Sequence, residues 1–357
     1  MTPIGVNGGV RFAIAIAVAA AIVSTAAAPL SAQALSGTIV SANMTANTAS
    51  VVDVATGQLR ATYPTGDGPH EVAISNDGRW AVVSIYGNRA SVGHSLLVLD
   101  LTGTDAPRTI EMGQYLRPHG MRFLPNDKRL IVTSEATQRV VLVNFSAGTI
   151  DTTISTGQPA THMVVLGPGA KRAFTTNISA KNISVLDLEH DTVVRTIDAG
   201  SRIEGIAATA SASEIWVGAN DDKVVLIFNP ATGEKVAQID GFGMPYRMSI
   251  TPDEKTAVIS DPGSERVIIA DAKTHRVRAT LDMTAAAPTA GDNAAHPSPQ
   301  GVTLSRDGRL AFVTLKALGK VAVIDIAAGT ILKTLDVGGG SDGVGYSPLA
   351  AARRKSP

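Results

Sequence analysis

The chain repeats one unit of four short β-rich segments, and this repeat restricts the folds that it can adopt. The second unit shows the pattern. Glu71–Ser75 is a short apolar segment, Asn76–Gly78 a tight turn, Trp80–Ser84 a second segment and Leu96–Asp100 a third that ends in Asp. Short segments rich in Val, Ile and Thr, bounded by Gly, Asp, Asn or Pro, are typical of β-strands, and no long stretch has a helical period.

The first segment of each unit begins at a polar residue, and these positions define the period. They are His70, His119, His162, Glu204, Arg247, Gln300 and Asp342, separated by 49, 43, 42, 43, 53 and 42 residues. Such a period is typical of four-stranded blades arranged in a ring. The sequence therefore predicts an all-β fold, a seven-bladed β-propeller with four strands in each blade.

The two ends of the repeat region complement each other. Three β-rich segments open it, at Thr38–Ala42, Ser50–Val54 and Leu59–Tyr63, and a single one closes it, at Gly343–Ser347. Three strands and one strand make a complete blade. We therefore expect the C-terminal strand to pair with the N-terminal three, which would cover strand edges that could otherwise template aggregation.

Several segments carry a recognisable repeat motif. Leu130–Ser134, Ala173–Asn177 and Ala311–Leu315 look like degenerate forms of the tetrapeptide YVTN, and Ile183–Asp187 and Val321–Asp325 match the rest of that repeat. The chain resembles YVTN-repeat (YncE-like) propellers and, more distantly, lactonase-like propellers. The resemblance implies the propeller fold over nearly the whole chain, and it suggests lactonase chemistry only weakly, because one fold hosts many functions.

The N-terminus has the features of an export signal. Arg11 precedes the apolar segment Phe12–Val23, and Ala32–Ala34 forms a small-x-small cleavage pattern. We expect a signal peptide at 1–34, a propeller at 35–348 and a disordered tail at 349–357. The mature protein would be periplasmic or secreted, without a membrane span.

Composition excludes several classes of function. Lys and Arg together number 31, as do Asp and Glu, so the sequence has no basic bias for nucleic acid. It contains no Cys, which excludes disulfides, iron–sulfur clusters, thiolate zinc sites and Cys nucleophiles. The expected partners are a small-molecule ligand or another protein.

The polar residues that begin the first strands form a candidate site at one mouth of the channel. Adjacent blades lie roughly 51° apart around the axis, so the neighbouring imidazoles of His70, His119 and His162 would face a common volume. Imidazole is a frequent metal ligand. We predict these three as ligands of a divalent metal, which the residue types do not distinguish among zinc, iron, manganese, copper and calcium. The alternative is a solvated mouth that simply accepts polar side chains.

Further side chains are predicted around these histidines. Glu204 could be a fourth ligand, a partner of a ligand or a general base, and Arg247 could hold an anionic group. Glu135 is expected to orient His119 on the same blade. Additional substrate-binding candidates are Gln300, Asp342, Asn177, Tyr246 and Tyr86. For each of them, an ordinary turn or edge position is the alternative.

The site is expected at the mouth that carries the long loops. Tight turns such as Asn76–Gly78 and Arg306–Gly308 leave little room at the opposite face. The insert Thr284–Ser298 is either a flap over the mouth or a surface loop. The residues that end third strands are interpreted as turn-forming, namely Asp53, Asp100, Asp187, Asp271 and Asp325.

Three classes of function fit these features. The first is a metal-dependent hydrolase of the lactonase kind, a lyase or an isomerase that acts on a small anionic molecule. The second is a non-catalytic periplasmic propeller that binds a ligand or a protein. The third is an oxidase or oxygenase with a His-ligated metal. Metal content of the purified protein separates the second class from the others.

Overall fold

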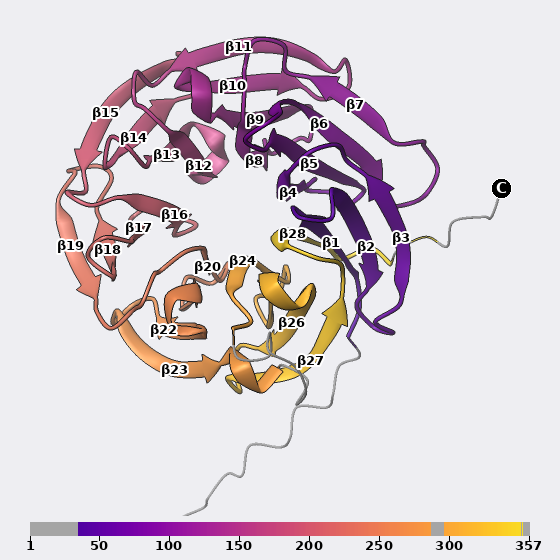
Figure 1. Cartoon of the computed structure of the whole chain (residues 1–357). Coiled ribbons are helices and arrows are strands. Elements are labelled where there is room, and N and C mark those ends of the chain that lie inside the picture. The colour runs from indigo at the N-terminus through magenta and orange to yellow at the C-terminus, as the bar shows by residue number, and fades with distance from the viewer. Residues whose placement is uncertain (1–34, 287–295, 351, 353–357) are drawn as a thin grey trace, which may run out of the picture. The chain divides into compact units, whose positions relative to one another are not determined.

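Seven four-stranded antiparallel sheets surround a central channel (Figure 1). The computed structural model describes residues 35–286, 296–350 and 352. This arrangement confirms the predicted seven-bladed β-propeller. The predicted signal peptide, 1–34, and residues 287–295 of the insert lie outside the described residues.

The first four blades follow the repeat units closely. Blade 1 contains β28 (Ser341–Ser347), β1 (Thr38–Asn43), β2 (Thr48–Asp53) and β3 (Leu59–Pro64). Blade 2 contains β4 (Pro69–Ile74), β5 (Trp80–Gly87), β6 (Val92–Asp100) and β7 (Arg108–Glu111). Blade 3 contains β8 (Pro118–Phe123), β9 (Arg129–Ser134), β10 (Arg139–Asn144) and β11 (Thr149–Ser155). Blade 4 contains β12 (Thr161–Leu166), β13 (Arg172–Asn177), β14 (Asn182–Asp187) and β15 (Thr192–Asp198).

The remaining blades continue the same order. Blade 5 contains β16 (Ile203–Ala208), β17 (Ile215–Ala219), β18 (Val224–Phe228) and β19 (Lys235–Ile239). Blade 6 contains β20 (Met248–Ile250), β21 (Thr256–Asp261), β22 (Arg266–Asp271) and β23 (Arg276–Asp282). Blade 7 contains β24 (Pro299–Leu304), β25 (Leu310–Leu315), β26 (Lys320–Asp325) and β27 (Thr330–Asp336). Short 3-10 turns are η1 (Glu135–Thr137), η2 (Pro168–Ala170), η3 (Pro262–Ser264), η4 (Met283–Ala286) and η6 (Lys316–Leu318).

Blade 1 is assembled from both ends of the repeat region, as predicted. The last strand, β28, pairs antiparallel with β1, with Thr38 opposite Ser347 and Val40 opposite Gly345. Figure 1 shows this yellow strand beside the indigo N-terminal strands. The ring is therefore closed by strand pairing, because β28 supplies the innermost strand of blade 1.

The hydrophobic core lies between adjacent blades. One cluster joins Phe174 and Val185 of blade 4 to Ile206 and Leu226 of blade 5. Similar clusters join the other neighbouring blades, so each sheet buries both of its faces. Among the described residues no helix is long and apolar enough to cross a membrane.

The Asp residues at third-strand ends form turns, as expected. The Asp53 carboxylate accepts hydrogen bonds from the backbone N–H of Thr56 at 2.8 Å and from Arg60 Nη2 at 2.8 Å. Asp187 and Asp271 accept equivalent backbone hydrogen bonds two and three residues further along the chain. These carboxylates belong to the repeat and lie outside the candidate site.

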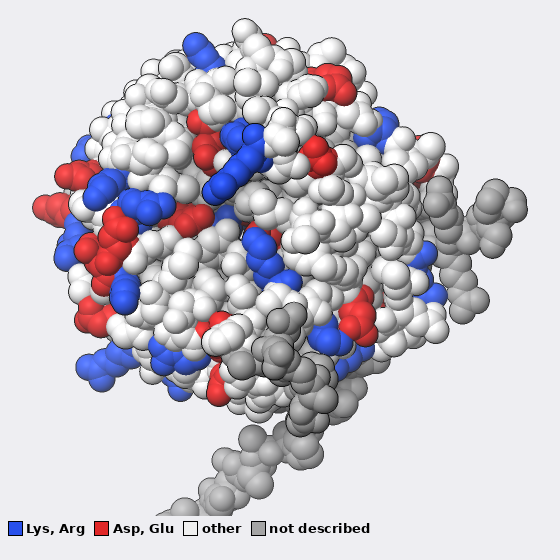
Figure 2. All heavy atoms as spheres, in the orientation of Figure 1, with Lys and Arg blue, Asp and Glu red and all other residues white. Residues whose placement is uncertain are grey.

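The surface mixes charges of both signs. On the face shown in Figure 2, Lys and Arg side chains are interspersed with Asp and Glu.

Of the predicted tail 349–357, residues 349, 350 and 352 are described. The carbonyl of Leu349 accepts a hydrogen bond from Thr38 Oγ1 at 2.7 Å, so the start of this segment contacts blade 1.

Candidate functional site

Glycines let the first strands approach each other around the channel. Gly205 lies so close to blade 6 that an added Cβ would be 2.0 Å from the Tyr246 carbonyl oxygen. An added Cβ at Gly301 would be 2.2 Å from the Asp342 carbonyl oxygen. Gly120 and Gly343 occupy the same position on other blades. Because these residues follow the polar column directly, the close approach brings the polar side chains together.

Hydroxyl groups of the second strands fix the same positions. Thr314 on β25 accepts a hydrogen bond from Gly301 N–H at 2.7 Å and donates to the Asp342 carbonyl of the next blade at 2.8 Å. Thr176 on β13 likewise joins Met163 N–H to the Glu204 carbonyl. Thr133 and Thr314 are the Thr of the degenerate YVTN segments, and Thr133 donates to the His162 carbonyl. These contacts, which we call the hydroxyl latches, tie His162, Glu204 and Asp342 to the preceding blade.

The rings of the three histidines lie next to one another at tilted angles and are nearly closed off from solvent. Ring centroids lie 4.2 Å apart for His70 and His119, and 3.7 Å apart for His119 and His162. Their exposed fractions are 8%, 0% and 5% in chain order. Burial, assisted by the nearby charges of His162, His70 and Arg247, lowers the pKa of His119 well below its usual value. His119 is therefore neutral, the form that binds metals.

His162 lies between two carboxylates. Its Nδ1 is 2.8 Å from Glu135 Oε2, and its Nε2 is 3.5 Å from Glu204 Oε1. Burial opposes protonation of His162, but these two carboxylates outweigh it and raise the pKa of the ring. Glu135 also accepts a hydrogen bond from Tyr86 Oη at 2.9 Å. Glu135 thus orients His162 on the next blade, where we had expected it to orient His119.

Burial and the Glu135 carboxylate raise the pKa of Tyr86 to about 12. The Tyr86 hydroxyl therefore keeps its proton and donates it in the hydrogen bond to Glu135. Glu204 accepts a hydrogen bond from Asn220 Nδ2 at 2.8 Å. Although burial disfavours its charge, His162 and Arg247 lower the pKa of Glu204 to about 2. A carboxylate with so low a pKa is a weak base, and its geometry suits it better to orienting His162 or binding a cation.

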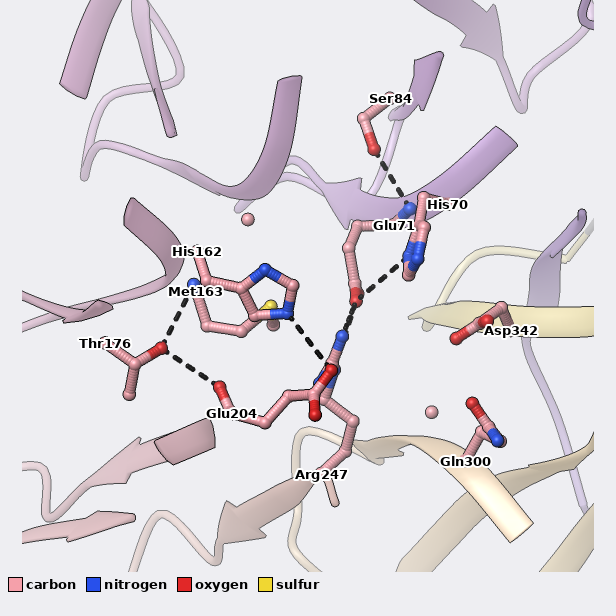
Figure 3. A network of polar contacts seen from close by, with 12 residues as sticks. His70, Glu71, Ser84, His162, Met163, Thr176, Glu204, Arg247, Gln300 and Asp342 are labelled. Atoms are coloured by element: carbon pink, nitrogen blue, oxygen red, sulfur yellow. Dashed lines mark hydrogen bonds and ion pairs between the residues drawn. The ribbon is translucent and has the colours of Figure 1, made fainter. Parts of the chain in front are cut away.

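Glu71 is a central residue of the site that our sequence analysis missed. Its Oε1 accepts hydrogen bonds from Arg247 Nη2 at 2.8 Å and Nε at 3.1 Å, across the channel (Figure 3). Despite burial, Arg247 and His70 lower the pKa of Glu71 to about 2. A signal for it existed: Glu71 stands where four other blades have Gly. Met163 and Met248 at the same position pack into the clusters between blades, so Glu71 is the charged exception.

The other side of the mouth holds the remaining column residues. Asp342 is 1% exposed, and its Oδ2 is 2.6 Å from Lys316 Nζ. Gln300 Nε2 donates to Ser298 Oγ at 3.2 Å. Tyr246 stacks beneath the Arg247 guanidinium at 4.2 Å, and burial raises its pKa well above 10. Figure 3 shows Gln300 and Asp342 on the side of Arg247 opposite to His162.

Asn177 belongs to the interior of its own blade. Its amide nitrogen donates to Asn182 Oδ1 at 2.8 Å and to Ser184 Oγ at 2.9 Å, and the residue is fully buried. Strand pairing shows why. Asn177 pairs with Thr161 as Ser134 pairs with Pro118, so the residue equivalent to Glu135 is Ile178. A shift of one residue along a strand moves the side chain to the other face.

Buried polar atoms without a partner concentrate at this mouth. Among the described residues they include both ring nitrogens of His119, His162 Nε2, His70 Nδ1, Arg247 Nη1, Gln300 Oε1 and Asp342 Oδ1. Buried polar groups are almost always hydrogen-bonded or ligated, because an unsatisfied one costs about 1–3 kcal/mol. The cluster therefore has the character of a binding site.

Two overlapping groups have donor atoms close enough to share a metal ion. His70, Glu71 and His119 form one group, and His119, Glu135 and His162 form the other, with all ligand atoms of a group within 4.8 Å. His119 belongs to both. Because Arg247 already neutralises Glu71, the second group is the more favourable place for a cation. The predicted set of three histidines is thus divided between two groups that share His119.

A cavity of about 350 Å³ occupies the other half of the channel. Its walls include Glu71, Arg122 and Arg247, and it extends to Pro252 and Arg306 in the short turns. The three histidines are not part of its lining. Our expectation that the short-turn face has little room for a site is therefore wrong. The first-strand side chains below the column are small or apolar on most blades and leave this space unfilled.

Comparisons with known proteins place the fold. No protein-family model and no curated protein matches the chain. The chain is similar to a solved structure titled Kuenenia stuttgartiensis hydrazine synthase, with 19% identity and a TM-score of 0.65, over 79% of this chain and 90% of that one. It is also similar to a functionally unknown protein of Desulfotomaculum acetoxidans DSM 771, with 13% identity and a TM-score of 0.70, over 87% of this chain and 99% of that one. At these identities the similarities show the fold alone, a seven-bladed β-propeller.

Proposed function

We propose that this protein is an exported, metal-dependent hydrolase built on a YVTN-repeat (YncE-like) propeller. The observation that carries the proposal is His119, a fully buried imidazole with neither ring nitrogen bonded to protein, between two rings that also have unpartnered nitrogens. A metal ion is the ligand that best satisfies several neutral imidazole and carboxylate donors at once.

The residues have distinct roles in this proposal. His119, His162 and Glu135 hold the ion, and His70 lies next to them. Tyr86 orients Glu135, and Glu204 orients His162. Arg247 provides a positive charge for a small anionic substrate, and the unpartnered oxygens of Gln300 and Asp342 can accept hydrogen bonds from hydroxyl groups of that substrate. When bound, a divalent ion supplies polarisation of a carbonyl group or activation of water. A lactone is the first substrate class to test.

Metal analysis of protein purified without chelators tests the first step. We expect about one ion per chain, which His119→Gln removes and His94→Gln retains, because His94 is exposed and distant from the column. Glu71→Gln should keep the ion if the second donor group holds it. A wild-type protein that contains no metal and gains no thermal stability from zinc, iron, manganese, copper or calcium contradicts the proposal.

Hydrolysis of a panel of lactones, with and without a chelator, tests the second step. Chelator-sensitive turnover that His119→Gln abolishes supports the hydrolase. N-terminal sequencing of protein recovered outside the cytoplasm tests export, and the mature chain should begin near Leu35.

A non-catalytic binding propeller is the second candidate. The burial of the three histidines favours it, because an ion held there would have little room for a substrate beside it. On this proposal the polar column binds a ligand or a protein, the purified protein contains no stoichiometric metal, and neither lactones nor other small anions are turned over.

A further inference from the structure

The cavity in the short-turn half of the channel carries an excess of positive charge. Its lining contains three arginines, Arg122, Arg247 and Arg306, and one acid, Glu71. Three positive charges and one negative charge leave a net charge of two. Charges inside a lumen walled by protein interact more strongly than in bulk water, so an unbalanced excess is unfavourable unless an anion compensates it.

Arg122 is the least compensated of these cations. It is on β8, and its Nη1 donates to the Met121 carbonyl at 2.7 Å. Among the described residues no carboxylate forms an ion pair with it, which leaves its other guanidinium donors available. Burial lowers the pKa of Arg122. On the other blades the same strand position holds Ala73, Val165, Ala207, Ile250, Thr303 and Gly345. The charge at Arg122 is thus no requirement of the repeat.

Arg247 also lines this space. Glu71 occupies its Nε and Nη2, whereas its Nη1 is buried without a partner. Arg306 is exposed at the rim, where its Nη2 donates to the Ser75 carbonyl at 3.3 Å. Donors on a guanidinium are planar and suited to a carboxylate.

The rest of the wall is largely apolar. It includes Val72, Phe123, Ile206, Val302 and Val344. A volume of about 350 Å³ is within the range of small-molecule sites, which combine apolar walls with a few convergent polar groups. The wall would therefore favour a ligand with both a charged head and an apolar body.

We propose that this cavity is a binding site for a small organic anion whose carboxylate contacts Arg122 and the unpartnered edge of Arg247, with its apolar body against Val72, Phe123 and Val302. The site is separate from the histidine cluster, because none of the three histidines lines the cavity. It does not depend on a bound metal.

Benzoate is a suitable probe, because it joins a carboxylate to an apolar ring. Titration calorimetry and thermal unfolding in low-salt buffer would compare it with sulfate, which lacks the apolar body, and with benzyl alcohol, which lacks the charge. We expect benzoate to bind more tightly than either. If benzyl alcohol bound as tightly as benzoate, the site would not recognise the charge. If sulfate bound as tightly as benzoate, the site would not recognise the apolar body. Either result would overturn the proposal.

Two variants locate the site. Arg122→Met keeps the aliphatic stem and removes the charge, and we expect it to weaken benzoate binding at least about tenfold. Arg195→Met, on the outer strand β15, is the matched control and should bind as wild type. Arg122→Met should unfold at or above the wild-type temperature without ligand, since it relieves an unbalanced charge. Unchanged benzoate affinity in a folded Arg122→Met protein would overturn the proposal. His119→Gln should retain benzoate binding, which separates this site from the proposed metal site.

Discussion

His162 is the residue whose surroundings are most fully specified. Glu135 holds its Nδ1 at 2.8 Å, and Tyr86 holds Glu135 in turn. Glu135 is also one of the three donors of the proposed metal group, so replacing it removes a charged ligand together with the contact that orients His162.

We therefore expect Glu135→Gln to lower zinc affinity at least about tenfold while the protein stays folded, because Gln keeps the shape and loses the charge. Titration calorimetry with zinc measures this effect. Glu111→Gln is the control, since Glu111 lies on the outer strand β7 beside exposed His94. Equal zinc affinity in Glu135→Gln and wild type would exclude Glu135 from the site.

At this scale the sequence predicted column residues well and their partners poorly. The seven first-strand positions follow from the period alone, and the structure brings them to one mouth. Contacts across blades depend on the direction of each side chain. Glu135 reaches the next blade. Asn177 turns inward because it corresponds to Ser134, and the residue that corresponds to Glu135 is Ile178. Glu71 could have been recognised as the exception in a position otherwise rich in glycine.

The hydroxyl latches explain why Thr recurs in the second strands. The latches of Thr176 and Thr314 join the backbone N–H of their own first strand to a carbonyl on the next blade, so they position the column without entering the site. Thr314 makes both contacts, to Gly301 and Asp342. Losing the hydroxyl leaves two buried backbone groups unsatisfied.

We expect Thr314→Val, which is nearly isosteric, to reduce the free energy of unfolding by about 1–3 kcal/mol. Thr314→Ser should recover most of this loss, because it retains the hydroxyl. Thr330→Val, at an exposed position of β27, should be close to neutral. Urea denaturation of the four proteins provides the measurement. A Thr314→Val protein as stable as wild type would show that this latch contributes nothing.

The turn-forming Asp residues should make the free energy of unfolding decrease in acid. Burial acts to raise the pKa of Asp53, but hydrogen bonds from Arg60 and Thr56 outweigh it and lower the pKa to about 2. A lowered folded-state pKa stabilises the protein above the unfolded value of about 4, and this contribution disappears as the pH falls toward 2. The same direction applies to Asp100, Asp187 and Asp271.

Urea denaturation at several pH values between 5 and 2 should therefore show a steep decline in stability. Asp53→Asn should be less stable at pH 7, by about 1 kcal/mol, and its decline between pH 4 and 2 should be shallower. Asp151→Asn, at an exposed site on β11, should follow the wild-type curve. A parallel decline for Asp53→Asn would assign the acid sensitivity to other groups.

At the scale of strands, the alternation of apolar and turn residues was enough to predict the blades, because each strand must bury side chains between two sheets. The cavity was not predictable in the same way. The cavity is the volume that the side chains of the seven first strands do not fill at one depth of the channel. Its size therefore depends on side chains from every blade together. Arg122 was overlooked because only the aligned structure shows that its position faces the lumen.

The whole molecule depends on one strand that joins the two ends of the repeat region. β28 pairs with β1 over most of its length, supplies Asp342 to the mouth and packs Val344 into the cluster between blades 7 and 1. Without it, β1 becomes an edge strand, and the latch from Thr314 loses its acceptor. The ring then has two unpaired ends in place of a continuous series of contacts.

Deleting residues from Ser341 onward should therefore affect the entire ring. We expect a melting transition that is broader and lower by many degrees, since blades 7 and 1 no longer support each other and opening can spread from the seam. A chain that ends at residue 352 keeps β28 and its hydrogen bond from Thr38 to Leu349, so it is the appropriate control and should melt as wild type. Calorimetry of both proteins measures the temperature and cooperativity of unfolding. A sharp, unshifted transition in the shorter chain would mean that six blades and three strands form a stable structure without closure, and that the seam contributes only locally.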